Sequence, residues 1–508
     1  MKTHDKVLSF EELTRVVARL KEEGRRVVYC HGVFDLLHIG HIRYFKNSAK
    51  QGSVLVVTLT PDKFVDKGIL RPAFTEEYRV EALASLDVVD YVAVNPWPTA
   101  EQSLRVLRPD VYSKGAEFKN PADDPTGKIQ LELDVLREIG GEMFFSEDVV
   151  FSSSNLINRF FSGFSEEVQE YLRLFRKRWS PEFVLDILDR MAALRVLVVG
   201  DAILDEYQYC TPLGKSSKDP VLAVQYQSRD IFPGGALAVA NHVANFAGHV
   251  SLLSVLAEDC PHAAFVKDRL RPGIEPVLHR RPGSVTTLKR RFVDSQSLVK
   301  MFEVYEMDPA PMEASLEAAL CADLERLMST VDLVLVADFG HGTVTPAMRR
   351  LLCAKAPYLV VNTQANAGNR GFHTIDLYSR VDCVVLAEHE ARLAARDLQS
   401  ELRPLAQHMQ TRLDCRHVVI TRGRKGVSIV SLGGDFTQVP AFVKEEVDAV
   451  GSGDALLGVL SLCSYLDLPH QVMGLIGNAA GAQAVGYIGN SESVDKMRLK
   501  KFLLAQLK

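Results

Sequence analysis

The chain has 508 residues, of which 47% are hydrophobic and 24% charged, and its formal net charge is −5. This composition is ordinary for a soluble globular protein, and the length predicts roughly two to four domains. The small negative charge provides no general attraction to nucleic acid or to anionic membranes, so we expect neither as a partner. The eight cysteines form no CxxC pair, which argues against a zinc site or a disulfide framework. No apolar run approaches membrane-spanning length and the charged start does not resemble a signal peptide, so we expect a cytoplasmic protein.

The first part of the chain alternates between helical and strand patterns. Ser9 and Glu12 form an S-x-x-E capping box, which predicts a helix that ends near Gly24. Apolar runs at 26–30 and 53–59 predict buried strands. Buried strands alternating with helices indicate a parallel sheet covered on both faces, continuing to about residue 159.

A helical connector is expected next. Ser165 and Ser180 are followed by acidic residues, and Ser180 also by Pro181, which is typical of helix starts. A new strand is predicted at 195–200, and α/β alternation continues to the end of the chain. The predicted organisation is a first domain at 1–164, a connector at 165–190 and a second domain at 191–508.

The first candidate site is the segment HGVFDLLHIGH at 31–41, which follows a predicted strand and opens a helix. Gly32 allows a tight turn, and Gly40 allows a phosphate to approach the backbone. His38 and His41 are spaced i, i+3, so both side chains can lie on one face of the first helical turn. At a helix N-terminus, two imidazoles can donate to a nucleoside triphosphate and to charge that develops at its α-phosphate.

This segment resembles the G-[TV]-F-D-x-x-H-x-G-H signature of the cytidylyltransferase-like nucleotidyltransferases. The resemblance places Phe34 in the turn of the nucleotide site, with Asp35 holding the loop. It also implies that Lys67 and Arg71 clamp the β- and γ-phosphates and that Lys114 belongs to the site. Hydroxyls of Ser152, Ser153 and Ser154 at a further helix start can bind phosphate, or can simply cap that helix. The HIGH motif of aminoacyl-tRNA synthetases is an inferior match, because the nearest lysine-rich partner, Lys496–Lys500, lies beyond a whole second domain.

The second candidate site is the segment DAVGSGDA at 448–455. Gly451, Ser452 and Gly453 form a loop whose backbone N–H groups can bind a γ-phosphate at the start of a helix. Asp454 at the helix entry can take a proton from an acceptor hydroxyl. Phosphoryl transfer needs mainly such positioning and charge stabilisation.

This segment resembles the D-x-[VT]-G-[AS]-G-D signature of the ribokinase (PfkB) family, and the resemblance covers 191–508. It implies a sugar site and a nucleotide loop. The sugar-site residues are Asp201, Asp205, Gly234, Gly235 and Asp338, and the nucleotide-loop residues are Thr421, Gly423 and Gly426. Asn478 belongs by this resemblance to the helix over the adenine. The expected fold is therefore α/β with two doubly wound domains, a Rossmann-like HxGH nucleotidyltransferase followed by a ribokinase-like kinase.

The fusion resembles the bifunctional heptose kinase/ADP-heptose synthase type, with the domain order reversed. The resemblance implies phosphorylation of heptose 7-phosphate at its anomeric oxygen and nucleotidyl transfer to the sugar 1-phosphate. Two asparagines of the family pattern are replaced by Ala238 and Ala387, and Asn241, about one turn on, is a candidate substitute for the first. Glu390 is retained and is a candidate magnesium ligand through water.

Three functions remain open at this point. The first is a two-activity enzyme that uses sugar phosphate, ATP and Mg²⁺, with CTP as a possible nucleotide in the transferase. The second is a transferase, for example for an alditol phosphate with CTP, whose kinase-like domain has altered or lost activity. The third is a scaffold with two inactive sites, which the intact phosphate loops argue against. Pairing of two chains through apolar strand edges is a further expectation.

Overall fold

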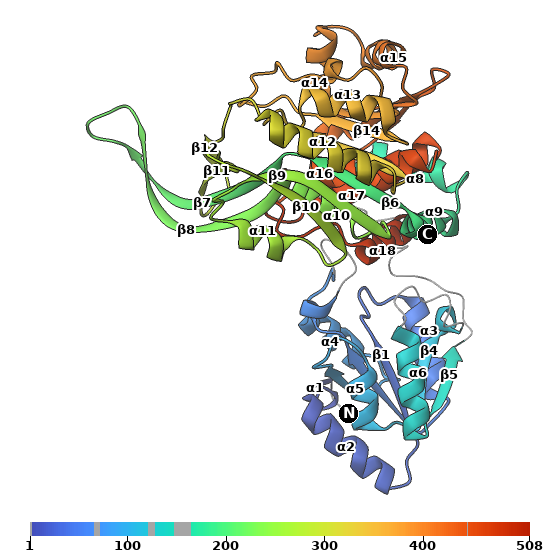
Figure 1. Cartoon of the computed structure of the whole chain (residues 1–508). Coiled ribbons are helices and arrows are strands. Elements are labelled where there is room, and N and C mark those ends of the chain that lie inside the picture. The colour runs from blue at the N-terminus through green and yellow to red at the C-terminus, as the bar shows by residue number, and fades with distance from the viewer. Residues whose placement is uncertain (1–2, 66–71, 120–127, 147–163, 444–445, 508) are drawn as a thin grey trace. The chain divides into compact units, whose positions relative to one another are not determined.

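The computed structural model describes residues 3–65, 72–119, 128–146, 164–443 and 446–507. The chain divides into two compact units, one built on residues 1–163 and the other on 164–503 (Figure 1). Among the described residues, no helix is both long enough and apolar enough to cross a membrane.

The first unit is a parallel five-stranded sheet in the order β3-β2-β1-β4-β5. Leu13 and Leu104 pack on one face, and Phe45 and Leu83 on the other, so the sheet is doubly wound as predicted. The strands are β1 (Val27–Gly32), β2 (Val54–Leu59), β3 (Tyr91–Val94), β4 (Val111–Gly115) and β5 (Glu142–Ser146). The helices are α1 (Thr3–Lys6), α2 (Phe10–Glu22), α3 (Ile39–Ala49), α4 (Glu76–Ala84), α5 (Glu101–Leu107) and α6 (Lys128–Ile139).

The predicted start and end of α2 are confirmed. Glu12 N donates to Ser9 Oγ at 3.2 Å, and Ser9 N donates to Glu12 Oε2 at 2.9 Å. Gly24 adopts a positive φ of 73° just beyond the helix, a conformation that costs glycine no steric strain.

The second unit contains a nine-stranded sheet in the order β10-β9-β6-β13-β14-β15-β16-β17-β18, in which β17 and β18 run antiparallel to their neighbours. Its strands are β6 (Arg195–Gly200), β9 (His249–Ala257), β10 (Ile274–Arg281), β13 (Leu333–Asp338), β14 (Leu359–Thr363), β15 (Cys383–Ala387), β16 (His417–Thr421), β17 (Val427–Ser431) and β18 (Phe436–Val439).

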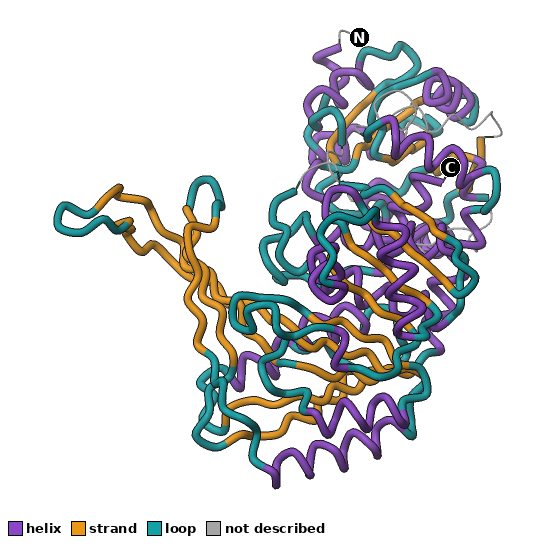
Figure 2. The backbone as a smooth tube through the Cα atoms, turned by 90° about the horizontal axis from the view of Figure 1, so that it is seen from above, coloured by secondary structure: helices purple, strands orange, loops and turns teal. Residues whose placement is uncertain are grey.

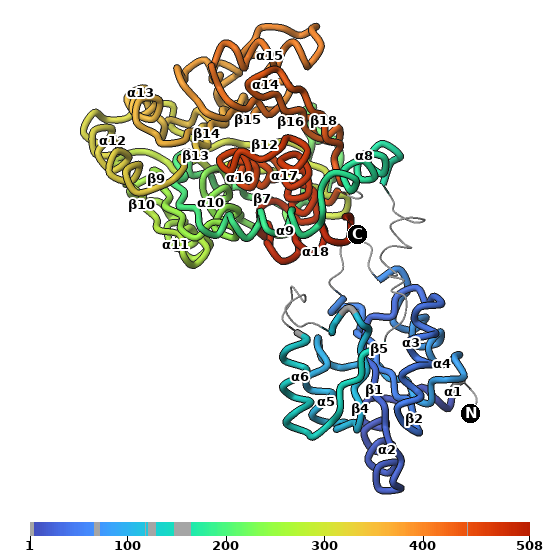
Figure 3. The backbone as a smooth tube through the Cα atoms, turned by 90° about the vertical axis from the view of Figure 1, so that its right-hand side faces the viewer, coloured from blue at the N-terminus to red at the C-terminus, as the bar shows by residue number. Residues whose placement is uncertain are grey.

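Helices cover both faces of this sheet (Figure 3). On one face are α8 (Glu166–Arg176), α9 (Pro181–Arg190), α10 (Ala236–Val243), α11 (Ala263–Arg269), α16 (Ser452–Tyr465), α17 (His470–Ala484) and α18 (Lys496–Leu507). On the other are α12 (Ala314–Met328), α13 (Pro346–Lys355), α14 (Glu388–Ala395) and α15 (Leu402–Leu413).

The segment expected to be a connector forms the helices α8 and α9. Ser165 and Ser180 cap them by accepting from Val168 N and Phe183 N, as their sequences predicted. Both helices contribute apolar side chains, among them Leu172, to the core of the second unit. They are therefore packed parts of this unit.

A smaller sheet in the order β12-β11-β7-β8 extends from the second unit. Its strands are β7 (Ala202–Lys215), β8 (Leu222–Gly235), β11 (Thr287–Asp294) and β12 (Lys300–Glu306). β7 and β8 pair from Ala202 opposite Gly235 to Lys215 opposite Leu222, and they form the long arm seen in Figure 2. β7 carries Asp205, and β8 carries Gly234 and Gly235, of the candidate sugar site.

Candidate functional site

The first candidate site lies at the carboxyl ends of β1 and β4. The strand order of the first sheet reverses between these neighbours, and ligands of open α/β sheets bind at such a switch point. The turn after β1 begins at Gly32, where an added Cβ would lie 3.0 Å from the Phe34 ring. Phe34 is buried and has a φ of 49°. Asp35 accepts from Ala73 N at 2.8 Å and Phe74 N at 3.2 Å, so it holds the loop.

His38 and His41 lie together at the start of α3. Their rings stack with centroids 4.1 Å apart. His38 is the N-cap, and its Nδ1 accepts from Gly40 N at 3.0 Å. This places the ring proton of neutral His38 on Nε2, where it can serve as a donor. Burial lowers the pKa of His38.

Lys114 lies at the end of β4, on the other side of the switch point. Its Nζ is 2.9 Å from Glu132 Oε2, and Tyr112 Oη donates to the same carboxylate oxygen at 3.1 Å. The predicted phosphate ligand is therefore already paired with a buried glutamate.

Arg79 lies in the same family-like segment of the sequence as Lys67 and Arg71, and it fixes the loop around this site. It is 1% exposed and donates to the backbone carbonyls of Val33 at 2.6 Å and Thr60 at 2.9 Å. The other predicted ligands, Lys67, Arg71, Ser152, Ser153 and Ser154, lie outside the described residues.

The second candidate site begins at the N-terminus of α16. Gly451 has a φ of 87°, and a Cβ there would overlap Asn490 Oδ1 at 2.0 Å. Ser452 Oγ donates to Ala449 O at 2.8 Å, whereas the Cα of Gly453 faces open space. The first N–H groups of a helix lack intrahelical acceptors, so this loop can bind an anion. Asp454 occupies the first turn of α16.

Asp454 faces a cluster of buried charges on the small sheet. Lys289 and Arg291 are 5% and 8% exposed, and Asp205 is 5% exposed. The parallel register of β11 and β7 places Lys289 opposite Asp205, and Arg291 Nη1 donates to Asp205 Oδ1. Burial, reinforced by the charge of Asp205 and opposed by Lys289 and Arg291, raises the pKa of Asp454 to about 7. A carboxylate with this pKa is suited to general-base catalysis near neutral pH.

Two glycines allow β8 to approach this cluster. A Cβ on Gly234 would lie 2.3 Å from Asp205 Oδ2, and one on Gly235 would lie 2.4 Å from Asp201 O. Gly235 also has a positive φ of 55°. Gly235 therefore requires glycine, and a larger residue at Gly234 would displace the Asp205 carboxylate.

A model of the pfkB family of carbohydrate kinases matches residues 195–497, more than half of the chain. The chain belongs to this family. A model described as cytidylyltransferase-like matches residues 29–159. Both predicted resemblances, and the predicted doubly wound fold, are thereby confirmed.

Curated relatives include the Bifunctional protein HldE of Methylococcus capsulatus, 29% identical over 317 residues that span 60% of this chain and 63% of the relative. The protein of the same name from Trichlorobacter lovleyi is 26% identical over 314 residues, which span 61% of this chain and 63% of the relative. The chain thus spans less than two thirds of these relatives' length. Phosphofructokinase-2 from Escherichia coli, in complex with potassium, shares the fold at a TM-score of 0.50 and 16% identity, covering 61% of this chain and 99% of that one.

Two aspartates of the kinase unit that are expected to bind sugar also organise loops. Asp201 is 1% exposed and accepts from Phe339 N at 2.9 Å, His341 N at 3.2 Å and Thr343 N at 2.9 Å. Asp338 accepts from Tyr378 Oη at 2.7 Å and lies 2.8 Å from His373 Nε2. Each carboxylate thus has partners on both oxygens within the protein.

The polar side-chain atoms of Asn241 and Glu390 also form hydrogen bonds within the protein. Asn241 donates to Arg269 O at 3.0 Å and accepts from Arg271 N at 2.9 Å, so its amide holds the turn after α11. Glu390 accepts from Ala387 N at 2.7 Å and Ala365 N at 3.1 Å, which makes it a cap of α14.

The predicted nucleotide loop is assembled around β16 and β18. Thr421 ends β16, Gly423 has a φ of 55°, and a Cβ on Gly426 would lie 2.0 Å from Val439 O. Asn478 donates to Val439 O and Pro440 O, both at 3.0 Å. Asn478 therefore fixes the wall of this loop.

Lys289, Arg291 and His341 lie near the candidate kinase site but were absent from the sequence analysis. The alternation of Lys289 and Arg291 along one strand was the available signal, because alternate strand residues share a face. His341 lies close enough to Lys289 for their charges to interact. Neither of its ring nitrogens has a hydrogen-bond partner within the described residues. Burial and the charges of Lys289 and His373 lower the pKa of His341 to about 4.

The described residues contain no group of three or more His, Cys, Asp or Glu side chains arranged to hold a metal ion. Magnesium commonly binds through phosphates and waters with one or two carboxylates. Asp454 and Asp205 are the carboxylates of the kinase site that could hold such an ion bound with its nucleotide, and Asp205 is also paired with Arg291.

Proposed function

We propose that this chain makes a nucleotide-activated sugar in two steps. In the first, Asp454 accepts the proton of a sugar hydroxyl, whose oxygen bonds to the γ-phosphorus of ATP while the bond to ADP breaks. In the second, an oxygen of the sugar 1-phosphate bonds to the α-phosphorus of a nucleoside triphosphate and pyrophosphate leaves. Magnesium bound to the nucleotides would neutralise phosphate charge in both steps.

The observation that carries the kinase step is the position of Asp454. Its carboxylate lies in the first turn of α16, beside the glycine loop and opposite Lys289 and Arg291. The loop N–H groups can hold the transferred phosphoryl group while the carboxylate orients the acceptor. We also propose that Gly451, Ser452 and Gly453 contact the transferred phosphoryl group. Asp205 is proposed to contact the sugar.

The transferase step is supported by the stacked pair His38 and His41 at the N-terminus of α3. His38 Nε2 can donate to phosphate oxygens, and the helix N-terminus favours anionic charge there. Lys114 would have to share its charge between Glu132 and the nucleotide.

Heptose 7-phosphate, phosphorylated at the anomeric oxygen, is the sugar that we propose, with ATP as the nucleotide in both steps. Support comes from the curated relatives named Bifunctional protein HldE and from the motif resemblance. The alternative is a transferase that uses CTP and an alditol phosphate, with a kinase unit of altered activity. Two observations favour this alternative. Ala238 replaces an asparagine expected to contact the sugar, and the amide of its candidate substitute, Asn241, is already hydrogen-bonded to Arg269 O.

We further propose that two chains pair through the small sheet. Leu222, Tyr226, Phe302 and Val304 of this sheet are large apolar side chains that are at least 42% exposed. Apolar surface of this kind is typical of protein–protein contacts.

The deciding experiment is a coupled assay of the purified chain with Mg²⁺, ATP or CTP, and a panel of sugar and alditol phosphates. ADP formed with one sugar, and pyrophosphate released with its 1-phosphate, would support the two-step function. Pyrophosphate release without ADP formation would favour the alternative. Neither product with any substrate would contradict both.

A further inference from the structure

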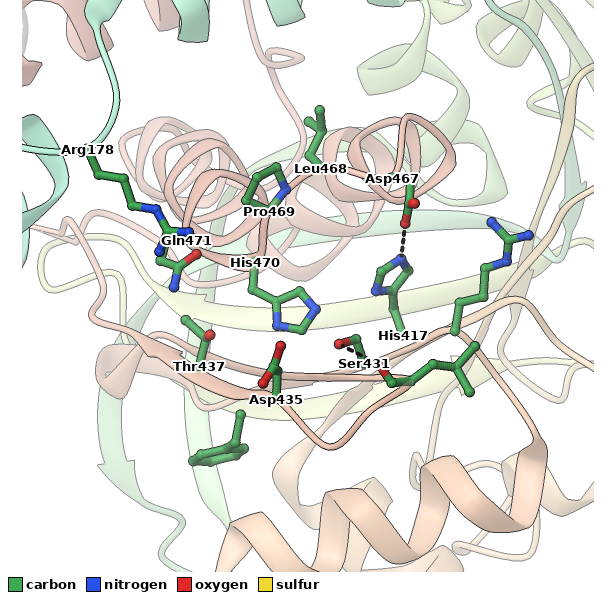
Figure 4. A pocket seen from close by; sticks show the side chains of 13 residues that line it. Arg178, His417, Ser431, Asp435, Thr437, Asp467, Leu468, Pro469, His470 and Gln471 are labelled. Atoms are coloured by element: carbon green, nitrogen blue, oxygen red, sulfur yellow. Dashed lines mark hydrogen bonds and ion pairs between the residues drawn. The ribbon is translucent and has the colours of Figure 1, made fainter.

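A pocket of about 730 Å³ lies in the kinase unit, away from the glycine loop (Figure 4). It is formed where β16 begins, beside β18 and the N-terminus of α17. The predicted nucleotide loop starts at Thr421, the last residue of β16, whereas His417, its first residue, lines the pocket. Four residues of extended strand separate the two by about 13 Å. The pocket therefore opens at the amino edge of the sheet, and the kinase site at the carboxyl edge.

The pocket contains a polar side chain that points to a ligand. His417 is 4% exposed, and its Nδ1 has no hydrogen-bond partner within the described residues. Its Nε2 lies 3.5 Å from Asp467 Oδ1, and Figure 4 shows the other ring nitrogen turned toward the middle of the pocket, facing His470. A buried ring nitrogen without a partner is unfavourable unless a ligand or water binds it.

The walls offer groups of two kinds. Arg178 and Arg416 line the pocket, and neither has a carboxylate within ion-pair distance among the residues that the structure describes. Unpaired guanidinium groups are suited to phosphate. Asp435, Thr437 and Gln471 also line it, and carboxylate, hydroxyl and amide groups can bind the hydroxyls of a sugar.

We propose that this pocket binds a phosphorylated sugar, free or as part of a nucleotide sugar, at a site separate from the kinase site. Pockets of about 300–1,000 Å³ are typical of small-molecule sites. Three elements run from this pocket to the nucleotide loop. β16 joins His417 to Thr421, α17 joins His470 to Asn478, and β18 carries Thr437 toward the carbonyl of Val439 that Asn478 contacts.

Trp179 provides a local signal for the test. The chain has two tryptophans, Trp97 and Trp179, and the guanidinium of Arg178 lies 5.2 Å from the Trp179 ring centroid. In a Trp97→Phe chain, Trp179 emission would report on the pocket alone. Titrations without nucleoside triphosphate would use heptose 7-phosphate, glucose 1-phosphate, ADP-heptose and inorganic phosphate.

We expect a saturable emission change with at least one sugar ligand, weakened about tenfold by Arg416→Gln because a charged hydrogen bond is lost. Arg190→Gln, an exposed arginine outside the pocket, should leave the affinity unchanged. Response to the free sugar phosphates would identify them as the ligand, and response to ADP-heptose alone would identify the nucleotide sugar. No saturable change, equal binding by Arg416→Gln, or equal affinity for inorganic phosphate would overturn the proposal. The assay needs no turnover, so its failure is distinguishable from failure of the proposed function.

Discussion

Lys300 Nζ donates to Asp448 Oδ1 over 2.6 Å and so ties the small sheet to the phosphate loop. Tyr207 Oη donates to Asp448 Oδ2 at 2.6 Å, and the same carboxylate accepts from Val450 N at 3.0 Å and Gly489 N at 2.9 Å. Burial opposes its ionisation, but these donors hold the pKa of Asp448 below its ordinary value. Asp448 precedes the Gly451 turn by three residues, so it positions the proposed anion site.

Lys300→Met should therefore lower the kinase kcat about tenfold or more, because the phosphate loop loses a support while the sugar-binding groups remain. The kinase KM for the sugar should change less than kcat, and Lys300→Arg should restore part of the rate. ADP formation measures this, with pyrophosphate release as the internal control. Lys218→Met, at an exposed position of the arm, should have no effect. Equal loss of both activities would indicate general unfolding instead.

As the proposed general base, Asp454 should make the kinase rate dependent on pH. Its pKa of about 7 means that the carboxylate is protonated below pH 7 and cannot accept a proton. The kinase rate should therefore rise as pH increases through about 7, while Asp454→Asn should abolish ADP formation and retain pyrophosphate release. A flat pH profile, or loss of both activities in this variant, would contradict the role of Asp454.

Lys289 should set the position of that pH profile. Its ammonium lowers the pKa of Asp454, so its removal in Lys289→Met should shift the rising limb to higher pH. Lys289→Arg keeps the charge and should keep the profile near that of the parent. The measurement is the kinase kcat as a function of pH for the three chains. A shift to lower pH in Lys289→Met would show that the electrostatic assignment is wrong.

The helix starts and the glycine turn could be predicted from sequence because their determinants are local. The capping box at Ser9, the N-caps at Ser165 and Ser180, and the glycine turn at Gly451 each involve residues within a few positions. Such patterns are read directly from the chain. The glycine turn and the HxGH segment resembled the signatures of two families, and models of both families match the chain.

The hydrogen-bond and ion-pair partners of the predicted polar residues could not be predicted from local sequence patterns. Asp201 accepts N–H groups that lie 138 to 142 positions further along the chain. The pairing of Lys289 with Asp205 requires β11 and β7 to adopt one particular parallel register. Long-range contacts of this kind depend on the completed fold, which single-sequence patterns do not specify. The sugar contact expected of Asp201 stays a prediction, and its backbone partners were not foreseen.

His38 caps α3 and is the proposed donor to phosphate, and two substitutions separate these roles. His38→Asn retains an N-cap residue but shortens the side chain, so pyrophosphate release should fall about 100-fold with little change in stability. His38→Ala also removes the cap that accepts from Gly40 N, and should lower the free energy of unfolding by about 1 kcal/mol in addition. Steady-state assays and denaturant unfolding of both variants would measure this. Full activity of His38→Asn would contradict the donor role.

Asp201→Asn tests whether this aspartate acts through the loop at 339–343. The carboxylate accepts from three backbone N–H groups, and an amide can offer only one oxygen to them. At least one buried donor would then be left facing another donor, at a cost of about 1–3 kcal/mol. We therefore expect a lower free energy of unfolding for the second unit and a lower kinase kcat, with the transferase unchanged. Asp268→Asn, at an exposed position of α11, is the matched control. A normal unfolding midpoint combined with a raised KM for the sugar would instead show that Asp201 contacts the substrate directly.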